Sequence, residues 1–199
     1  MRFALAGHDV VIGSRDATRA EETAATLAAG GGKGGGGLSG ALNREAAARG
    51  HVVFVTVPYA GMVATLQAVR RELDGKICVC TVAPIEIAGG QARLQTAGES
   101  AAEEAARAVP AARWVASLHT VPAADLLRRD ARVNTDALVC SDDEGARRAV
   151  IDLLEEIPGL RGVDAGRLHN ARHLEGATAL LINLNRIHGT HASLRVQGI

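Results

Sequence analysis

The chain has 199 residues, enough for one ordinary domain or one domain with a small appendage. Its 22 Lys and Arg residues balance its 22 Asp and Glu residues, and only 2% of its residues are aromatic, so it lacks the basic field and stacking rings of a single-strand nucleic-acid binder. Apolar runs end well before the roughly 20 residues of a membrane-spanning helix, and residues 1–15 lack the layout of a secretory signal, so we expect a cytoplasmic protein without membrane or nucleic-acid partners.

The first predicted strand, around residues 10–15, ends in a polar and basic corner. Ser14 and Arg15 close the apolar run, and Arg19 follows one helical turn later in a predicted helix over residues 17–29. In dinucleotide-binding folds this corner holds an acid for the ribose of NAD, whereas an arginine there accommodates the 2′-phosphate of NADP. A guanidinium can bind a phosphate through two parallel hydrogen bonds. The corner therefore predicts a site for NADP(H).

A glycine run at residues 30–37 looks superficially like a phosphate-binding loop. Walker and Rossmann loops both lie between a strand and a helix. Here the glycines follow a predicted helix and precede Leu38-Ser39-Gly40, so their context fits neither loop. A flexible connector is the favoured interpretation.

Further along the chain, apolar runs alternate with helical patterns. The predicted strands cover residues 51–57, 76–82, 114–118 and 137–140, and the predicted helices cover residues 62–73, 144–157 and about 170–188. This alternation predicts a parallel α/β sheet with right-handed crossovers. We expect a nucleotide-binding domain over residues 1–135 and a smaller α/β region over residues 136–199 that ends in the long helix.

Prolines follow three of the predicted strands. Pro58, Pro84 and Pro122 each stop an apolar run, and ligands of parallel sheets lie beyond the carboxyl ends of the strands. A proline there leaves nearby carbonyl and amide groups free to face a ligand, which would suit a flat nicotinamide ring. Each proline alone is better explained as ending its strand, and the three together leave both interpretations open.

The cysteines and histidines do not form a convincing metal site. Cys78 and Cys80 share one face of a predicted strand, which favours buried free thiols over a disulfide. Two pairs of histidines near the C-terminus have helical spacing, but no thiol or acid completes either set, and Glu175 lies in the wrong phase. We expect no metal.

Motifs along the whole chain resemble those of NADPH-dependent reductases of the deazaflavin coenzyme F420. The matching stretches, in the same order, are GHDVVIGSRD, VFVTVPY, TVAPIE, SLHTVPA, the turn at residues 140–143, GLRGVDAG and LEGATALLINLNR. This resemblance implies a cleft that binds NADP(H) and coenzyme F420. It assigns cofactor binding to Ser14, Arg15, Arg19, Val57, Pro58, Gly61, Ala83, His119 and Ala123.

The resemblance also implies a role for each of these nine residues. The first three match the family's 2′-phosphate corner, and the next three match the strand end beneath the cofactor and the start of the following helix. Ala83 matches a position beside the nicotinamide, Ala123 one beyond the His-Thr-Val-Pro turn, and His119 the histidine that lines the deazaflavin side. The family's reaction is direct hydride transfer between the two rings, which the protein mainly stacks and orients. We therefore expect no obligatory catalytic acid or base, and His119 is a candidate for polarising or positioning the deazaflavin.

The start of the chain departs from this family. Full-length relatives begin with a strand and a glycine-rich turn, and residues 1–6 align with the end of the helix that follows. The expected fold is a Rossmann-like parallel sheet lacking its first strand and glycine-rich loop, with a small C-terminal helical portion. One hypothesis is that Met1 is an internal methionine, with the missing segment encoded upstream.

The function implied by the resemblance is hydride transfer between NADP(H) and F420 by a homodimer joined through its last helix. Two alternatives stay open on the sequence. One is a non-catalytic remnant that dimerises or binds a ligand weakly. The other is a reductase of a small imine or hydroxy acid on the same fold.

Overall fold

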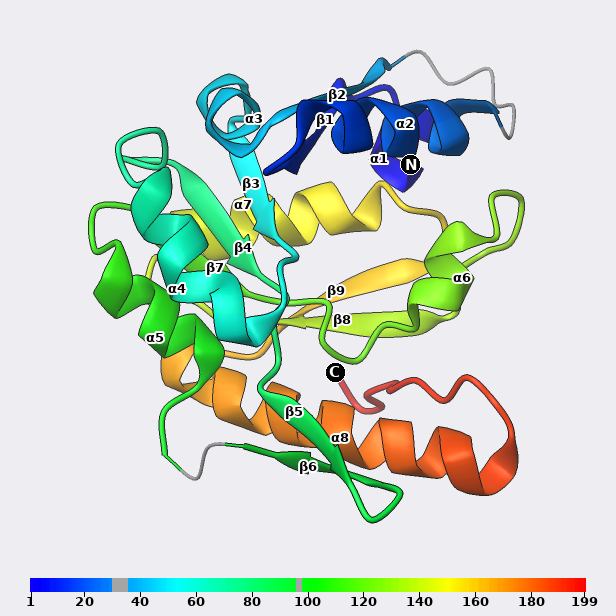
Figure 1. Ribbon diagram of the computed structural model, residues 1–199. Coiled ribbons are helices and arrows are strands. Elements are labelled where there is room, and N and C mark those ends of the chain that lie inside the picture. The colour runs from blue at the N-terminus through cyan, green and yellow to red at the C-terminus, as the bar shows by residue number, and fades with distance from the viewer. Residues whose placement is uncertain (30–35, 96–97) are drawn as a thin grey trace.

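The computed structural model describes residues 1–29, 36–95 and 98–199 (Figure 1). Its helices are α1 (Arg2–Leu5), α2 (Ala17–Ala29), α3 (Asn43–Arg49), α4 (Tyr59–Ala68), α5 (Ala101–Ala108), α6 (Ala123–Leu127), α7 (Glu144–Glu155) and α8 (Ala171–His188). Its strands are β1 (Val10–Ser14), β2 (Leu38–Leu42), β3 (Val52–Val55), β4 (Ile77–Cys80), β5 (Ile85–Ala88), β6 (Gln91–Leu94), β7 (Arg113–Ala116), β8 (Thr135–Val139) and β9 (Leu160–Asp164). Most of the glycine run predicted as a flexible connector lies outside the described residues.

The centre of the molecule is a parallel sheet of three strands in the order β3-β4-β7, with α4 and α5 on one face and α7 on the other (Figure 1). Side chains alternate between the two faces, as the geometry of a strand requires. Cys78 and Cys80 pack with α4 and α5, whereas Val79 packs with α7. Strands β4 and β7 are buried over most of their length and β3 is mostly half-buried, and the predicted free, buried thiols of Cys78 and Cys80 are confirmed.

Two further parallel pairs flank this sheet. β1 pairs with β2, and β8 pairs with β9. A short antiparallel bridge joins β7 to β8, where Ala116 and Cys140 exchange backbone hydrogen bonds of 2.8 and 3.0 Å. Within the described residues β1 does not pair with β3. The predicted α/β class and parallel pairing are confirmed, and the ladder is interrupted between β1 and β3.

The sequence patterns did not predict several elements or their bounds. The hairpin β5–β6 turns at Gly89 and Gly90, whose φ angles of 55° and 76° favour glycine, and it packs against α8. Helix α5 begins with a capping box formed by Ser100 and Glu103. The helix predicted over residues 62–73 is instead α4, because Pro58 is its N-cap and residues 69–75 form turns.

The end of the chain folds back onto β8. Helix α8 ends at Gly189 in the left-handed conformation, and the tail then runs beside the strand. The Asp136 amide donates to Leu194 O at 3.0 Å, and the Val196 amide donates to the Asp136 carboxylate at 2.6 Å. A cluster of buried side chains crosses residue 135, with Val79 and Val115 packed against Val150. The division into residues 1–135 and 136–199 stays a prediction.

Candidate cofactor-binding site

The polar corner at the end of β1 has the form that a phosphate requires. The Ser14 hydroxyl accepts a hydrogen bond from the Asp16 amide at 3.2 Å, which leaves its own proton available to donate. Arg15 and Arg19 are exposed, and neither forms an ion pair within the part of the chain that the structure describes. A hydroxyl donor at the end of β1 is thus followed by two exposed arginines, Arg15 directly after the strand and Arg19 in the first turn of α2.

The ends of β3, β4 and β7 form a common edge. Val55, Cys80 and Ala116 are paired across the three strands, so the segments after them leave the sheet at the same level. Val57 and Ala83 are half-buried in these segments, and Pro58 is exposed. The three strand ends that precede the prolines therefore lie along one edge of the sheet.

The prolines at this edge do not leave their own carbonyl groups free, and the expectation for the neighbouring carbonyl and amide groups stays a prediction. The carbonyl oxygens of the three prolines all accept backbone hydrogen bonds, at 3.0 Å from Gly61 to Pro58, 2.7 Å from Gln95 to Pro84 and 3.1 Å from Asp125 to Pro122. Two of the prolines act as N-caps, Pro58 for α4 and Pro122 for α6. These two prolines stop strands and start helices, and the three proline carbonyls are occupied by backbone hydrogen bonds.

Gly61 and Ala123 lie in the first turns of the two helices that leave this edge. A side-chain carbon added at Gly61 would meet nothing within 4 Å, so no packing contact requires glycine there. Ala123 is exposed at the first position of α6. Both positions leave open space next to the strand ends.

His119 is the one predicted site residue that is buried, with 8% of its surface exposed. Its Nε2 lies 3.2 Å from Val82 O, and because a carbonyl oxygen only accepts, Nε2 carries the proton and donates. Burial lowers the pKa of His119 to about 4, so the ring is neutral at physiological pH. Its Nδ1 has a lone pair and no hydrogen-bond partner among the described residues. A buried acceptor without a donor costs about 1–3 kcal/mol.

The backbone around His119 is strained and braced. Leu118 has a φ of 67°, which non-glycine residues rarely adopt. The Thr178 hydroxyl of α8 lies 2.9 Å from His119 O and 3.0 Å from Leu174 O, so its single proton is shared between the two carbonyls. Helix α8 therefore forms one wall of this edge and holds the histidine segment.

Glu175, one turn of α8 away from Ala171, is a buried acid that the sequence analysis did not assign to the site. Only 1% of its surface is exposed, and its Oε1 accepts from the Ala101 amide at 2.9 Å, at the start of α5. Burial raises the pKa of Glu175 to about 7, against the lowering effect of the bonds from Ala101 and Ala102. Its place on the apolar face of α8, four residues after buried Ala171, is the signal that could have revealed it.

The described residues fit part of each expected cofactor. The Ser14 corner fits a 2′-phosphate, and the unpaired Nδ1 of His119 fits a ring that presents a hydrogen-bond donor. No glycine-rich turn between a strand and a helix lies at this edge within the described residues, so they supply no amide cradle for a pyrophosphate. The two ends of a dinucleotide are thus better matched than its middle.

Within residues 1–29, 36–95 and 98–199, no three or more His, Cys, Asp or Glu side chains are grouped so that they could hold a metal ion. In the same residues no helix is both long enough and apolar enough to cross a membrane.

Solved structures define the class of protein. The crystal structure of a putative F420-dependent NADP-reductase from Arthrobacter sp. FB24 superposes with a TM-score of 0.79 at 25% identity, covering 99% of this chain and 94% of that one. A pyrroline carboxylate reductase from Plasmodium falciparum, solved with NADP bound, has a TM-score of 0.53 at 11% identity and shows likeness of fold alone. The chain has the fold of Rossmann-like oxidoreductases.

Sequence comparison identifies the family. Residues 1–84 match the family described as NADP oxidoreductase coenzyme F420-dependent. The F420-dependent NADP reductase of Methanothermobacter thermautotrophicus is 37% identical over 205 residues, covering 100% of this chain and 88% of the relative. That of Methanocaldococcus jannaschii is 35% identical over 181 residues, covering 88% of this chain and 81% of the relative. The chain belongs to the F420-dependent NADP reductases, a family of oxidoreductases.

Proposed function

We propose that this chain transfers a hydride between NADP(H) and coenzyme F420. Membership of the family supports the reaction class. The observation that carries the proposal is the shared edge of β3, β4 and β7, where neutral, buried His119 has an unpaired acceptor, Nδ1, that is closed to solvent beneath α8. Such a site suits an uncharged ring that carries an N–H or O–H donor.

The role of the chain's own residues is to bind the two cofactors and to orient their rings. Ser14, Arg15 and Arg19 hold the 2′-phosphate, and Val57 with Pro58 forms the surface beneath the nicotinamide end. Gly61, Ala83 and Ala123 leave room for a planar group, and His119 positions the deazaflavin through Nδ1. When bound, NADP(H) and F420 supply the redox chemistry, a hydride passing between nicotinamide C4 and deazaflavin C5. The protein then contributes by holding two rings in contact and excluding water, which requires no charged acid or base.

The test is to mix the purified chain with NADPH and F420 and to follow the absorbance of the oxidised deazaflavin. We expect the absorbance to fall in proportion to protein concentration. A folded chain that leaves the absorbance unchanged would overturn the proposal and favour a non-catalytic remnant.

The 2′-phosphate corner has its own test. We expect Arg15→Ala to raise KM for NADPH by about 10- to 100-fold, the effect of one lost charge-assisted contact, and to leave KM for NADH within about twofold. Arg49→Ala, which removes an exposed arginine at the end of α3, is the matched control and should change neither value. Equal losses for both cofactors in Arg15→Ala would refute the assignment.

We further propose that the protein is a cytoplasmic homodimer joined through α8. Leu180 and Ile187 lie seven residues apart on this helix and are 59% and 72% exposed, which makes one apolar stripe. Ile87, on the hairpin that packs against α8, is also exposed. The buried free thiols of Cys78 and Cys80 suit a reducing compartment.

A further inference from the structure

Arg2 is a buried cation whose guanidinium is surrounded by backbone carbonyls. Only 8% of the residue is exposed, and no carboxylate in the described part of the chain forms an ion pair with it. Its donors reach the carbonyl oxygens of Asp125, Leu126 and Ala131 at 3.0, 3.0 and 2.8 Å, that of Arg129 at 3.0 Å, and that of Arg128. A charge so deeply buried is tolerated because its N–H groups are hydrogen-bonded.

These carbonyls belong to the last turn of α6 and the loop after it. The end of a helix leaves carbonyl groups without partners inside the helix, and a cation is favourable there. A guanidinium spreads five N–H donors over a planar fork, whereas an ammonium has three donors at a single point. Arg2 therefore fixes the shape of residues 125–131 in a way that Lys cannot reproduce.

The same loop also holds α2. The Arg129 guanidinium donates to Leu27 O near the end of that helix. Helix α1 precedes β1, and Leu27 lies near the end of α2, so both contacts hold the β1–α2 unit at the end opposite the Ser14 corner (Figure 1). We call these contacts, made by Arg2 and Arg129, the 125–131 joint.

Residues 125–131 also lie close in sequence to the segment that leaves the strand-end edge. Helix α6 begins at Ala123, four residues after His119. Because β1 and β3 share no ladder among the described residues, side-chain contacts must set the placement of the Ser14 corner relative to that edge. The joint connects the β1–α2 unit, which carries the corner, to the loop that follows the His119–Ala123 segment, while Phe3 of α1 packs on Phe54 of β3.

We propose that Arg2 is a positioning residue that sets the span between the Ser14 corner and the His119–Ala123 segment, and so the fit of NADP(H) along its whole length. This inference rests on the proposed function, because it takes these two places as the two ends of the cofactor site. A ligand that touches only the corner does not depend on the span, whereas a complete dinucleotide does.

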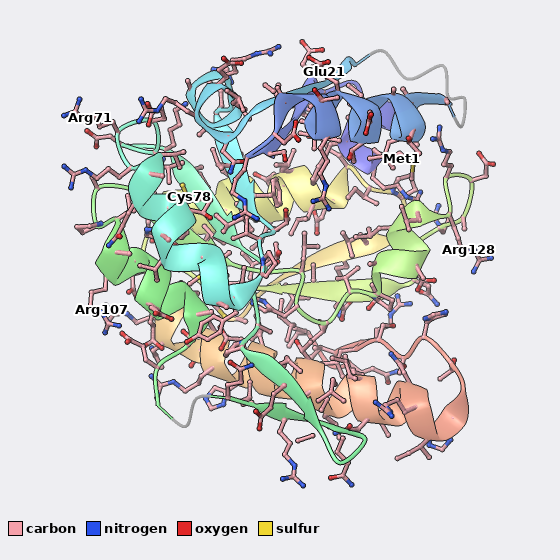
Figure 2. The ribbon with its side chains drawn as sticks, viewed as in Figure 1. Met1, Glu21, Arg71, Cys78, Arg107 and Arg128 are labelled. Atoms are coloured by element: carbon pink, nitrogen blue, oxygen red, sulfur yellow. The ribbon has the colours of Figure 1, made fainter. Side chains whose placement is uncertain are left out.

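The test compares two ligands on the full chain. Adenosine 2′,5′-bisphosphate carries the 2′-phosphate end alone, and NADPH carries both ends. By calorimetry we expect Arg2→Ala to weaken the affinity for NADPH by about tenfold or more and to change the affinity for the bisphosphate by less than about twofold. Arg2→Lys should behave like Arg2→Ala, because one ammonium cannot span the carbonyls. Arg128→Ala is the matched control, since its side chain extends outward (Figure 2) and its carbonyl is retained, and it should change neither affinity.

Hydrogen exchange gives a second measurement, independent of any cofactor. Amides of residues 123–131 should exchange faster in both Arg2 variants, while those of β4 keep the wild-type rate. Equal weakening of the two ligands, or unchanged NADPH binding, overturns the inference, and Arg2→Lys decides the matter if Arg2→Ala does not fold. A wild-type chain that binds NADPH but does not reduce F420 contradicts only the proposed function. A wild-type chain that binds neither ligand overturns both.

Discussion

Replacing Glu175 with glutamine should make the protein more stable at alkaline pH. The carboxyl group is almost fully buried between α8 and the start of α5, and burial raises its pKa from 4.5 to about 7. Between these two values the folded chain holds a proton that the unfolded chain has released. The free energy of unfolding therefore falls as pH rises through this window. A glutamine oxygen can still accept from the Ala101 amide without carrying a charge.

The size of the effect follows from the difference between the two pKa values. At about 1.4 kcal/mol per pH unit, a change from 4.5 to about 7 corresponds to about 3 kcal/mol. We expect Glu175→Gln to match the wild type near pH 4.5 and to exceed it by up to about 3 kcal/mol at pH 8, where the wild-type carboxylate is charged.

The assay is urea unfolding of both proteins at intervals from pH 4.5 to 8. Glu86→Gln, which alters an exposed acid on β5, is the control and should follow the wild-type curve. The difference in free energy between Glu175→Gln and wild type should grow with pH and level off above about 7. A constant difference, or a variant less stable than wild type at pH 8, would refute the reasoning. A constant difference would mean that folding does not raise the pKa of Glu175, and a less stable variant at pH 8 would mean that the carboxylate stabilises the start of α5 as an anion.

Three further predictions concern the edge, the tail and the dimer face. His119→Asn should lower the rate of F420 turnover by about tenfold. Because the pKa of His119 is about 4, the wild-type rate should show no titration of His119 between pH 6 and 8. A change of rate in this pH range that the variant abolishes would contradict the neutral ring. Asp136→Asn should lower the free energy of unfolding by about 1–3 kcal/mol, since the half-exposed Arg161 loses its carboxylate partner, and it should speed amide exchange at residue 196. Arg161 also keeps the pKa of Asp136 low, so this stability is present above pH 4 and is lost as pH falls below it. Unchanged exchange at residue 196 would count against the contact. The double variant Leu180→Glu, Ile187→Glu should sediment as a monomer, and an unchanged sedimentation coefficient would exclude α8 as the dimer contact.

The apolar strands were predictable because burial on both faces leaves a mark in the sequence. The run at residues 51–57 contains β3, and that at residues 76–82 contains β4, each a little shorter than its apolar run. Parallel pairing brings the ends of these strands to one edge of the sheet, so the residues that directly follow the strands could be expected to lie near one another. The corner at Ser14 was visible for the same reason.

The hairpin β5–β6 has no recognisable pattern in the sequence. Its strands are four residues each, and most of their side chains are exposed, so neither length nor alternation distinguishes them from a loop. It is held by α8, where the Asn183 amide exchanges hydrogen bonds of 2.7 and 3.0 Å with Ala92. Periodicity within one segment cannot reveal a partner 91 residues away.

Arg2 and Glu175 show why the sequence could predict the parts of the site more readily than their arrangement. Each is a charged residue type that is normally exposed, and each is buried because backbone groups from a distant segment surround it. Arg2 reaches a carbonyl 129 residues along the chain, and Glu175 accepts from an amide 74 residues away. Apolar packing tolerates a small shift between layers, whereas these hydrogen bonds are lost within about an ångström. We therefore expect the strand ends to supply the surfaces of the proposed site, and the few buried polar contacts between elements to set the separation between those surfaces.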